Sequence, residues 1–112
     1  MKYLDINTWN RKQHFEHFSK FVDPYFGVVV DVDVTNTYLF SKKTTIPFFA
    51  LYLHACMKAI NSVENLKYRI IDDKIVIHEI IHASATIFRE DTTFGFTFID
   101  YSEDFTTFYK KF

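Results

Sequence analysis

The stretch that decides the fold is LKYRIIDDKIVIHEIIHASATIFREDTTFGFTFI, residues 66–99. It contains four runs rich in β-branched and aromatic residues, a composition that predicts strands. The expected strands cover residues 66–71, 74–81, 83–88 and 93–99. The pair Asp72-Asp73 between the first two runs predicts a tight hairpin turn, and residues 89–92 predict a second hairpin. Alternate residues of the last run are expected to share one strand face: Phe94, Phe96 and Phe98.

A helix and another strand are expected near the N-terminus. Asn7 or Thr8 can cap a first helix that runs to about Lys20. Residues 26–34 then alternate Phe or Val at even positions with a set of odd positions that turns acidic toward its end. This period of two predicts an amphipathic strand.

Two further helices are expected between residues 33 and 62. Asp33 or Thr35 can open a short one. Thr45 can cap a long one that ends near Ser62, with Pro47 in its first turn, where a missing N–H has no cost. The long helix is apolar on most sides, so we expect it to be well buried.

A last helix is expected to open near Ser102 and to end at Lys110 and Lys111, since acidic residues at its start and basic ones at its end suit the helix dipole. The resulting order, α-β-α-α-β-β-β-β-α, predicts an α+β fold. We expect a two-layer sandwich in which a mostly antiparallel sheet carries helices on one side. Residues 1–112 are interpreted as a single domain or part of one.

Composition excludes several classes of protein. The chain has 112 residues, a net charge of −1, one cysteine and 14 phenylalanines. Without a basic field, nucleic-acid binding is not expected, and a single cysteine allows no intrachain disulfide. The N-terminus has no apolar signal core, and the longest apolar stretch is too short to span a bilayer. We therefore expect no membrane association and a cytoplasmic location.

Other chemical sites receive little support from the sequence. His78 and His82 are four residues apart, a metal-ligand spacing only if both lie on one helix. Their surroundings predict strand and turn, so no metal is expected. A nucleophile-histidine triad assembled in space stays open, but no sequence pattern locates one.

Several short segments together carry a family resemblance. They are residues 6–15 (INTWNRKQHF), 31–34 (DVDV), 47–49 (PFF), 59–61 (AIN), 72–73 (DD), 86–94 (TIFREDTTF) and 104–109 (DFTTFY). In order and spacing, over nearly the whole chain, they resemble the chloramphenicol acetyltransferase family. The resemblance implies a coenzyme-A-dependent acyltransferase-like fold.

The resemblance implies a trimeric enzyme that moves an acetyl group from acetyl-CoA to a hydroxyl of chloramphenicol, with active sites at subunit interfaces. It also implies a histidine general base in a His-His-x-x-x-Asp-Gly motif near the C-terminus. This sequence contains no such motif. Its histidines are His14, His17, His54, His78 and His82. We therefore expect an N-terminal half without the catalytic residue, which does not catalyse the reaction alone and aggregates or depends on a partner for folding.

The resemblance also assigns positions around the small-molecule acceptor. The matching residues are His17, Phe18, Val22, Tyr25 and Phe26 on one wall and Phe94 and Phe96 on another. Arg11 matches an arginine that pairs with the motif aspartate and so supports the catalytic loop. The family usually has Tyr at the position of Phe18 and Phe at that of His17. Phe18 and Val22 also fit a plain helix core.

Three hypotheses for the function stay open. The chain can represent an acetyltransferase by its N-terminal half. It can be a catalytically inactive relative that binds a ligand or forms oligomers. It can also be a non-functional fragment, since its last helix runs to Phe112.

Overall fold

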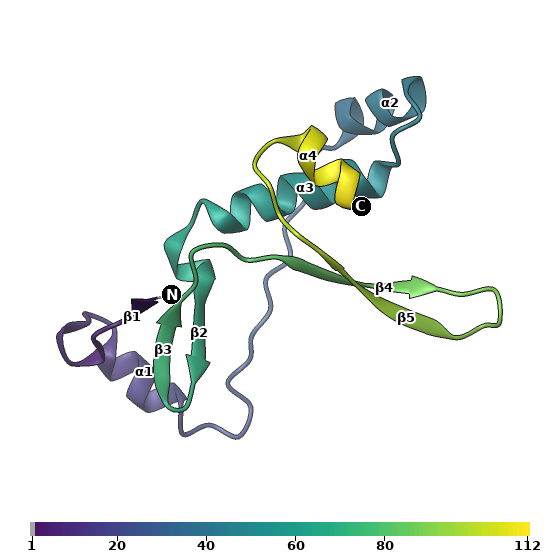
Figure 1. Ribbon diagram of the computed structural model, residues 1–112. Coiled ribbons are helices and arrows are strands. Elements are labelled where there is room, and N and C mark those ends of the chain that lie inside the picture. Colours follow the sequence, from purple (N-terminus) through teal and green to yellow (C-terminus); the bar gives the residue numbers. More distant parts are fainter. Residues whose placement is uncertain (1) are drawn as a thin grey trace.

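The computed structural model describes residues 2–112, which form an open and elongated molecule (Figure 1). Its radius of gyration is 17.7 Å, whereas a compact domain of this length has about 13 Å. Its accessible surface is 9322 Å², about 2,800 Å² more than a compact monomer of this mass exposes. Much of the apolar side-chain surface is therefore not covered within the chain.

The elements come in the following order. They are β1 (Lys2–Tyr3), η1 (Ile6–Thr8), α1 (Lys12–Phe18), α2 (Thr35–Lys43), α3 (Phe48–Asn61), η2 (Glu64–Lys67), β2 (Tyr68–Ile71), β3 (Lys74–Ile77), β4 (Ala83–Phe88), β5 (Phe94–Ile99) and α4 (Phe105–Lys111). This mixture of helices with antiparallel strands confirms the predicted α+β class.

Two separate antiparallel sheets contain the strands, one with the order β1-β3-β2 and one formed by β4 and β5. Both predicted hairpins are confirmed, with Arg69 opposite Val76 in the first and Thr86 opposite Phe96 in the second. Asp72 and Asp73 have φ values of 51° and 62°. Successive left-handed residues are what a two-residue hairpin turn requires, because they match the twist of the flanking strands.

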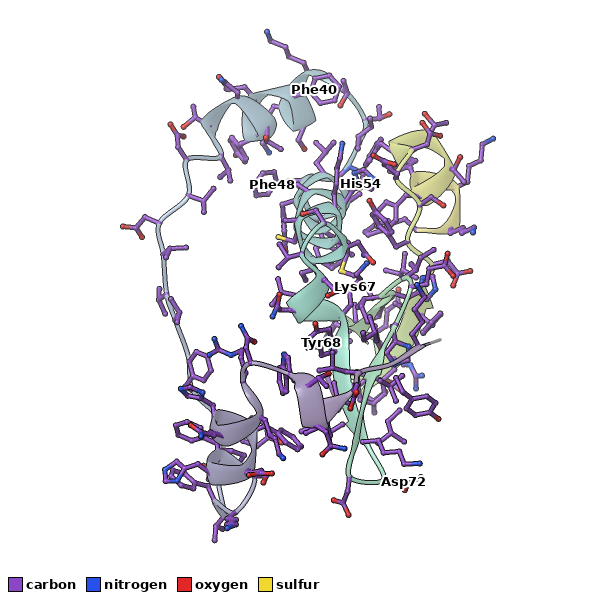
Figure 2. All side chains as sticks on the ribbon, turned by 90° about the vertical axis from the view of Figure 1, so that its left-hand side faces the viewer. Phe40, Phe48, His54, Lys67, Tyr68 and Asp72 are labelled. Atoms are coloured by element: carbon purple, nitrogen blue, oxygen red, sulfur yellow. The ribbon has the colours of Figure 1, made fainter. Side chains whose placement is uncertain are left out.

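The core lies where α3, α4 and the base of the β4–β5 hairpin meet. It consists of Met57, Ala83, Ile99 and Phe108. The buried His54 on α3 points toward α4 (Figure 2). Its Nε2 lies 2.9 Å from the carbonyl oxygen of Ser102, and its ring stacks on Tyr101 at 5.8 Å. These contacts fix α4 across α3. The prediction that the long helix is well buried is wrong for this chain, because only Ala50, His54 and Met57 of α3 are buried and α4 covers one side of it.

The predicted helix starts differ from the structure in detail. The first helix is divided, because a 3₁₀ turn (η1) whose N-cap is Asp5 comes before α1. Its predicted caps, Asn7 and Thr8, lie inside that turn. Pro47 is the N-cap residue of α3 instead of a first-turn residue, and the neighbouring Thr44, not Thr45, accepts a hydrogen bond from the N–H of Ile46.

The last helix also begins later than predicted. Asp104, not Ser102, is its N-cap and accepts hydrogen bonds from Thr107 N at 3.0 Å and Thr107 Oγ1 at 2.8 Å. The two bonds hold the pKa of the Asp104 carboxyl below its usual value. A short acidic side chain at this position satisfies backbone N–H groups that the helix itself leaves free.

The strand predicted over residues 26–34 is not formed. This segment is a lone extended connection between α1 and α2 (Figures 1 and 2). Residues 26–33 belong to no helix or strand, and no backbone N–H or C=O group of theirs forms a hydrogen bond with another backbone group among residues 2–112. Val28 and Val30 are 76% and 71% exposed. The alternating pattern fixes which side chains share a face, but a strand also needs a neighbour for its ladder.

Candidate functional site

A cavity of about 540 Å³ lies between α1 and the chain that follows it. Its lining consists of Arg11, His14, Phe18, Phe21, Asp23, Pro24, Tyr25 and Phe26. Three phenylalanines, a tyrosine and a proline give it an apolar and aromatic wall. Arginine, histidine and aspartate add a few polar groups. A small aromatic molecule with polar substituents fits this kind of lining.

Helical spacing explains one side of the cavity. Arg11, His14 and Phe18 are separated by three and four residues, so α1 places them on one face. The other side comes from the turn after α1. There Asp23 Oδ1 accepts a hydrogen bond of 3.4 Å from Tyr25 N, and Pro24 restricts the backbone between them. The side chain of Asp23 thus helps to set the direction in which Tyr25 leaves the turn.

Three aromatic rings pack together at the cavity wall. His17 lies 5.0 Å from Phe18 and 5.1 Å from Phe21, and the two phenylalanines lie 5.1 Å apart. All three pairs are edge-to-face, an arrangement that aromatic rings prefer. His17 therefore contacts two residues that line the cavity, without lining it itself.

The structure brings only part of the predicted acceptor site together. Phe18, Tyr25 and Phe26 line the cavity, whereas Val22 points into solvent and does not line it. Arg11, predicted as support for the catalytic loop, also lies in the lining. The predicted second wall is elsewhere in this chain. Its two residues, Phe94 and Phe96, lie on β5, are 61% and 77% exposed and do not line the cavity.

Four lining residues were missed by the sequence analysis: His14, Phe21, Asp23 and Pro24. A signal existed for His14, because it lies three residues after Arg11 and four before Phe18. Phe21 lies three residues after Phe18 and would continue this face in the helix predicted to reach Lys20, but α1 ends at Phe18 and Phe21 lies in the turn that follows. Asp23 and Pro24 offered no such signal, since a turn has no fixed period.

The β4–β5 hairpin has two different faces. Its inner face lies over α3 and the end of α4, where a groove of about 280 Å³ is lined by Phe49, Ala85, Thr86, Ile87, Thr97, Ile99 and Phe112. The three phenylalanines of β5 occupy the outer face, with the rings of Phe94 and Phe96 5.7 Å apart. The guanidinium of Arg89 lies against Gly95, and a β-carbon at position 95 would clash with it.

A sequence profile of chloramphenicol acetyltransferases matches residues 1–112, the whole chain. The chain belongs to the chloramphenicol acetyltransferase family. A chloramphenicol acetyltransferase of Klebsiella sp is 29% identical over 106 residues, which are 94% of this chain and 48% of that protein. One of Bacillus pumilus is 26% identical over 111 residues, 98% of this chain and 50% of that protein.

The fold comparison agrees with the sequence comparison. A solved structure of a chloramphenicol acetyltransferase matches with a TM-score of 0.90 at 30% identity, over 98% of this chain and 52% of that chain. This chain therefore spans about half the length of the chloramphenicol acetyltransferases it matches. Its open shape is that of the corresponding part of the family fold.

Other chemistry has little support in the described part of the chain. Residues 2–112 contain no group of three or more histidine, cysteine, aspartate or glutamate side chains arranged for a metal ion. His82 Nδ1 accepts a hydrogen bond of 2.8 Å from Tyr101 N, so this histidine joins the base of the hairpin to the following segment. None of the helices found among these residues has the length and apolar character needed to cross a bilayer.

Proposed function

We propose that this chain provides the acceptor-binding part of an O-acetyltransferase that moves an acetyl group from acetyl-CoA to chloramphenicol or a related small alcohol. The aromatic cavity at the end of α1 carries this proposal. Its residues include Phe18, Tyr25 and Phe26, three of the positions that the family resemblance assigns to the acceptor, and Arg11, which the resemblance assigns to support of the catalytic loop. A volume of about 540 Å³ suits a drug-sized ligand, since such pockets span about 300–1,000 Å³.

The acceptor's ring would lie against Phe18 and Phe26. Phe18 stands where the family usually has tyrosine, so this wall cannot donate a hydroxyl hydrogen bond. Acceptor selectivity should therefore differ from that of relatives with a tyrosine. His17 would act indirectly by holding the rings of Phe18 and Phe21, which it contacts at 5.0 and 5.1 Å.

In our proposal the functional unit is a homotrimer with sites at subunit interfaces. The supporting observation is that Phe94 and Phe96 lie on an exposed hairpin face and not at the cavity of their own chain. A neighbouring copy would then bring these two rings to the cavity as its second wall. In the complete fold, the two small sheets and residues 26–34 would join one mostly antiparallel sheet with helices on one side, a two-layer sandwich.

The chemical step needs a base that removes the proton of the acceptor hydroxyl as its oxygen attacks the thioester carbonyl of acetyl-CoA. We assign that base to the His-His-x-x-x-Asp-Gly histidine of the family, which this sequence does not contain. Arg11 would hold the loop of that motif through a paired carboxylate. Acetyl-CoA is the second substrate, and no residue of this chain is assigned to it.

Calorimetric titration of the 112-residue chain with chloramphenicol tests the acceptor site. We expect binding, and we expect Phe18→Ala or Phe26→Ala to weaken it about two- to tenfold, since each removes an aromatic contact. Phe40→Ala is the matched control, because Phe40 on α2 is an exposed phenylalanine outside the cavity. Absence of chloramphenicol binding, or equal losses in all three variants, would contradict the proposal.

An acetylation assay tests the assignment of the base. With acetyl-CoA and chloramphenicol, the chain alone should release no coenzyme A above the background rate. Turnover by the purified 112-residue chain would show that one of its own groups serves as the base. Binding without turnover is also what a catalytically inactive relative shows. Adding the second half of a related enzyme then separates the two, because only a competent acceptor half gains activity.

A further inference from the structure

We propose that His14 determines acceptor specificity by hydrogen-bonding a hydroxyl of the molecule bound in the aromatic cavity. This inference rests on the proposed acceptor function of that cavity. His14 was not among the residues that the family resemblance assigns to the site. The structure nevertheless puts it in the lining, on the same face of α1 as Arg11 and Phe18.

The polar groups of the cavity differ in what they can offer a hydroxyl. Arg11 only donates hydrogen bonds. Oδ1 of Asp23 already accepts from Tyr25 N at 3.4 Å. The hydroxyl of Tyr25 can donate and accept, and both Tyr25 and His14 are exposed. A neutral imidazole donates through one nitrogen and accepts through the other. His14 can therefore accept the hydrogen of an alcohol, which Arg11 cannot do.

Nothing in the described part of the chain competes for the ring of His14. No hydrogen bond or ion pair to its nitrogens occurs among residues 2–112, in contrast to His54 and His82, whose rings bond to backbone groups at 2.9 and 2.8 Å. Those two histidines have structural partners, whereas His14 lies beside an aromatic slot with its nitrogens available.

Chloramphenicol and its 1-deoxy analogue provide the test, because the analogue lacks the secondary hydroxyl and keeps both the aromatic body and the primary hydroxyl that is acetylated. Calorimetry on the 112-residue chain should show tighter binding of chloramphenicol than of the deoxy analogue. His14→Phe should weaken chloramphenicol binding about two- to tenfold, the worth of one net hydrogen bond, and should make the two ligands equal. His14→Asn keeps an acceptor and should keep part of the preference.

His78→Phe is the matched control, since it changes a histidine that follows β3 and does not line the cavity. It should leave the ratio of the two affinities unchanged. A ratio in His14→Phe equal to that of the unmodified chain would overturn the inference while leaving the acceptor site intact. Failure of the unmodified chain to bind chloramphenicol would instead refute the proposed function. Far-UV circular dichroism of each variant separates a lost contact from a lost fold.

Discussion

Asn61 joins the end of α3 to the strand region, and its replacement by alanine gives a sharp test of this architecture. Its Nδ2 donates to the carbonyl oxygens of Met57 at 2.9 Å and Ile81 at 3.0 Å. Its Oδ1 accepts from Ile81 N at 2.8 Å. One side chain therefore forms three hydrogen bonds, two of them to a residue twenty positions away. The bonds to Ile81 set where the chain enters the β4–β5 hairpin.

The expected loss of stability follows from the number of bonds. A net hydrogen bond contributes about 0.5–1.5 kcal/mol, and a buried donor left without a partner costs about 1–3 kcal/mol. Asn61 is only partly buried, so water can reach some of the freed groups. We therefore expect Asn61→Ala to lower the free energy of unfolding by about 2–3 kcal/mol.

Urea unfolding followed by circular dichroism measures this change, and amide exchange of Ile81 reports the local effect. Ser62→Ala is the control, because it removes one exposed hydrogen bond, from Ser62 Oγ to the oxygen of Ala59 at 2.7 Å. That variant should lose less than about 1 kcal/mol. Equal losses in the two variants, or unchanged exchange at Ile81, would refute the proposed role of Asn61.

Asn61→Asp adds a pH dependence with a defined sign. The new carboxylate keeps the acceptor for Ile81 N–H but faces the two carbonyl oxygens that Nδ2 now binds. Its charged form is disfavoured in the folded state, so its folded pKa is raised above the unfolded value of about 3.9. The variant is therefore least stable at neutral pH. It should regain stability as the pH falls through the folded pKa, where the native state takes up a proton.

Three other predictions follow from single contacts. Phe108→Ala should lower the free energy of unfolding by about 3–5 kcal/mol, the usual loss for a large buried ring, because Phe108 is 0% exposed in the core; denaturant unfolding checks it. Asp73→Gly should raise the melting temperature, because it relieves a left-handed backbone at φ 62° that costs a non-glycine residue about 1–2 kcal/mol. The pKa of Asp104 is lowered by its hydrogen bonds from Thr107, so its stabilising effect is present above the unfolded value of about 3.9 and is lost as the pH falls through the folded pKa; helix content followed during acid titration should show this loss.

Each of these three has a contradicting outcome. A loss for Phe108→Ala no larger than for the exposed Phe88→Ala would mean that the core is not centred on this ring. A lower melting temperature for Asp73→Gly would mean that Asp73 contributes more than its turn geometry. If Asp104→Asn loses helix content over the same pH range as the unmodified chain, the charge of the Asp104 carboxylate is not the cause of that loss.

The parts of the fold that local chemistry decides could be predicted from the sequence. Asp72 and Asp73 tolerate the left-handed conformation and lie between two apolar runs, so the hairpin was evident. Phe94 and Phe96 share a face because strand geometry requires it. The lone segment 26–34 shows the limit of this reasoning, since its pattern is that of a strand but the partner of a strand is not written in its own residues.

The candidate site also contains some residues that could be predicted from the sequence and others that could not. The α1 face of Arg11 and Phe18 follows from helical spacing, and His14 lies on it for the same reason. Asp23 enters the cavity through a turn, and turn geometry depends on local hydrogen bonds that have no period. Phe94 was grouped with Phe18 by family resemblance, whereas the structure of one chain places them on different elements. A sequence alone does not show whether two surfaces that form one site belong to the same subunit or to two different subunits.

The extended segment 26–34 also affects how readily the protein is degraded. Proteases bind their substrates as extended chains, and cleavage concentrates in exposed connections. Here the backbone already has that shape, with no need for prior unfolding, so whatever covers these residues also shields them from degradation. Protein molecules in which residues 26–34 are uncovered should be degraded first. The steady-state amount of the protein should then depend on the amount of the partner surface that covers these residues.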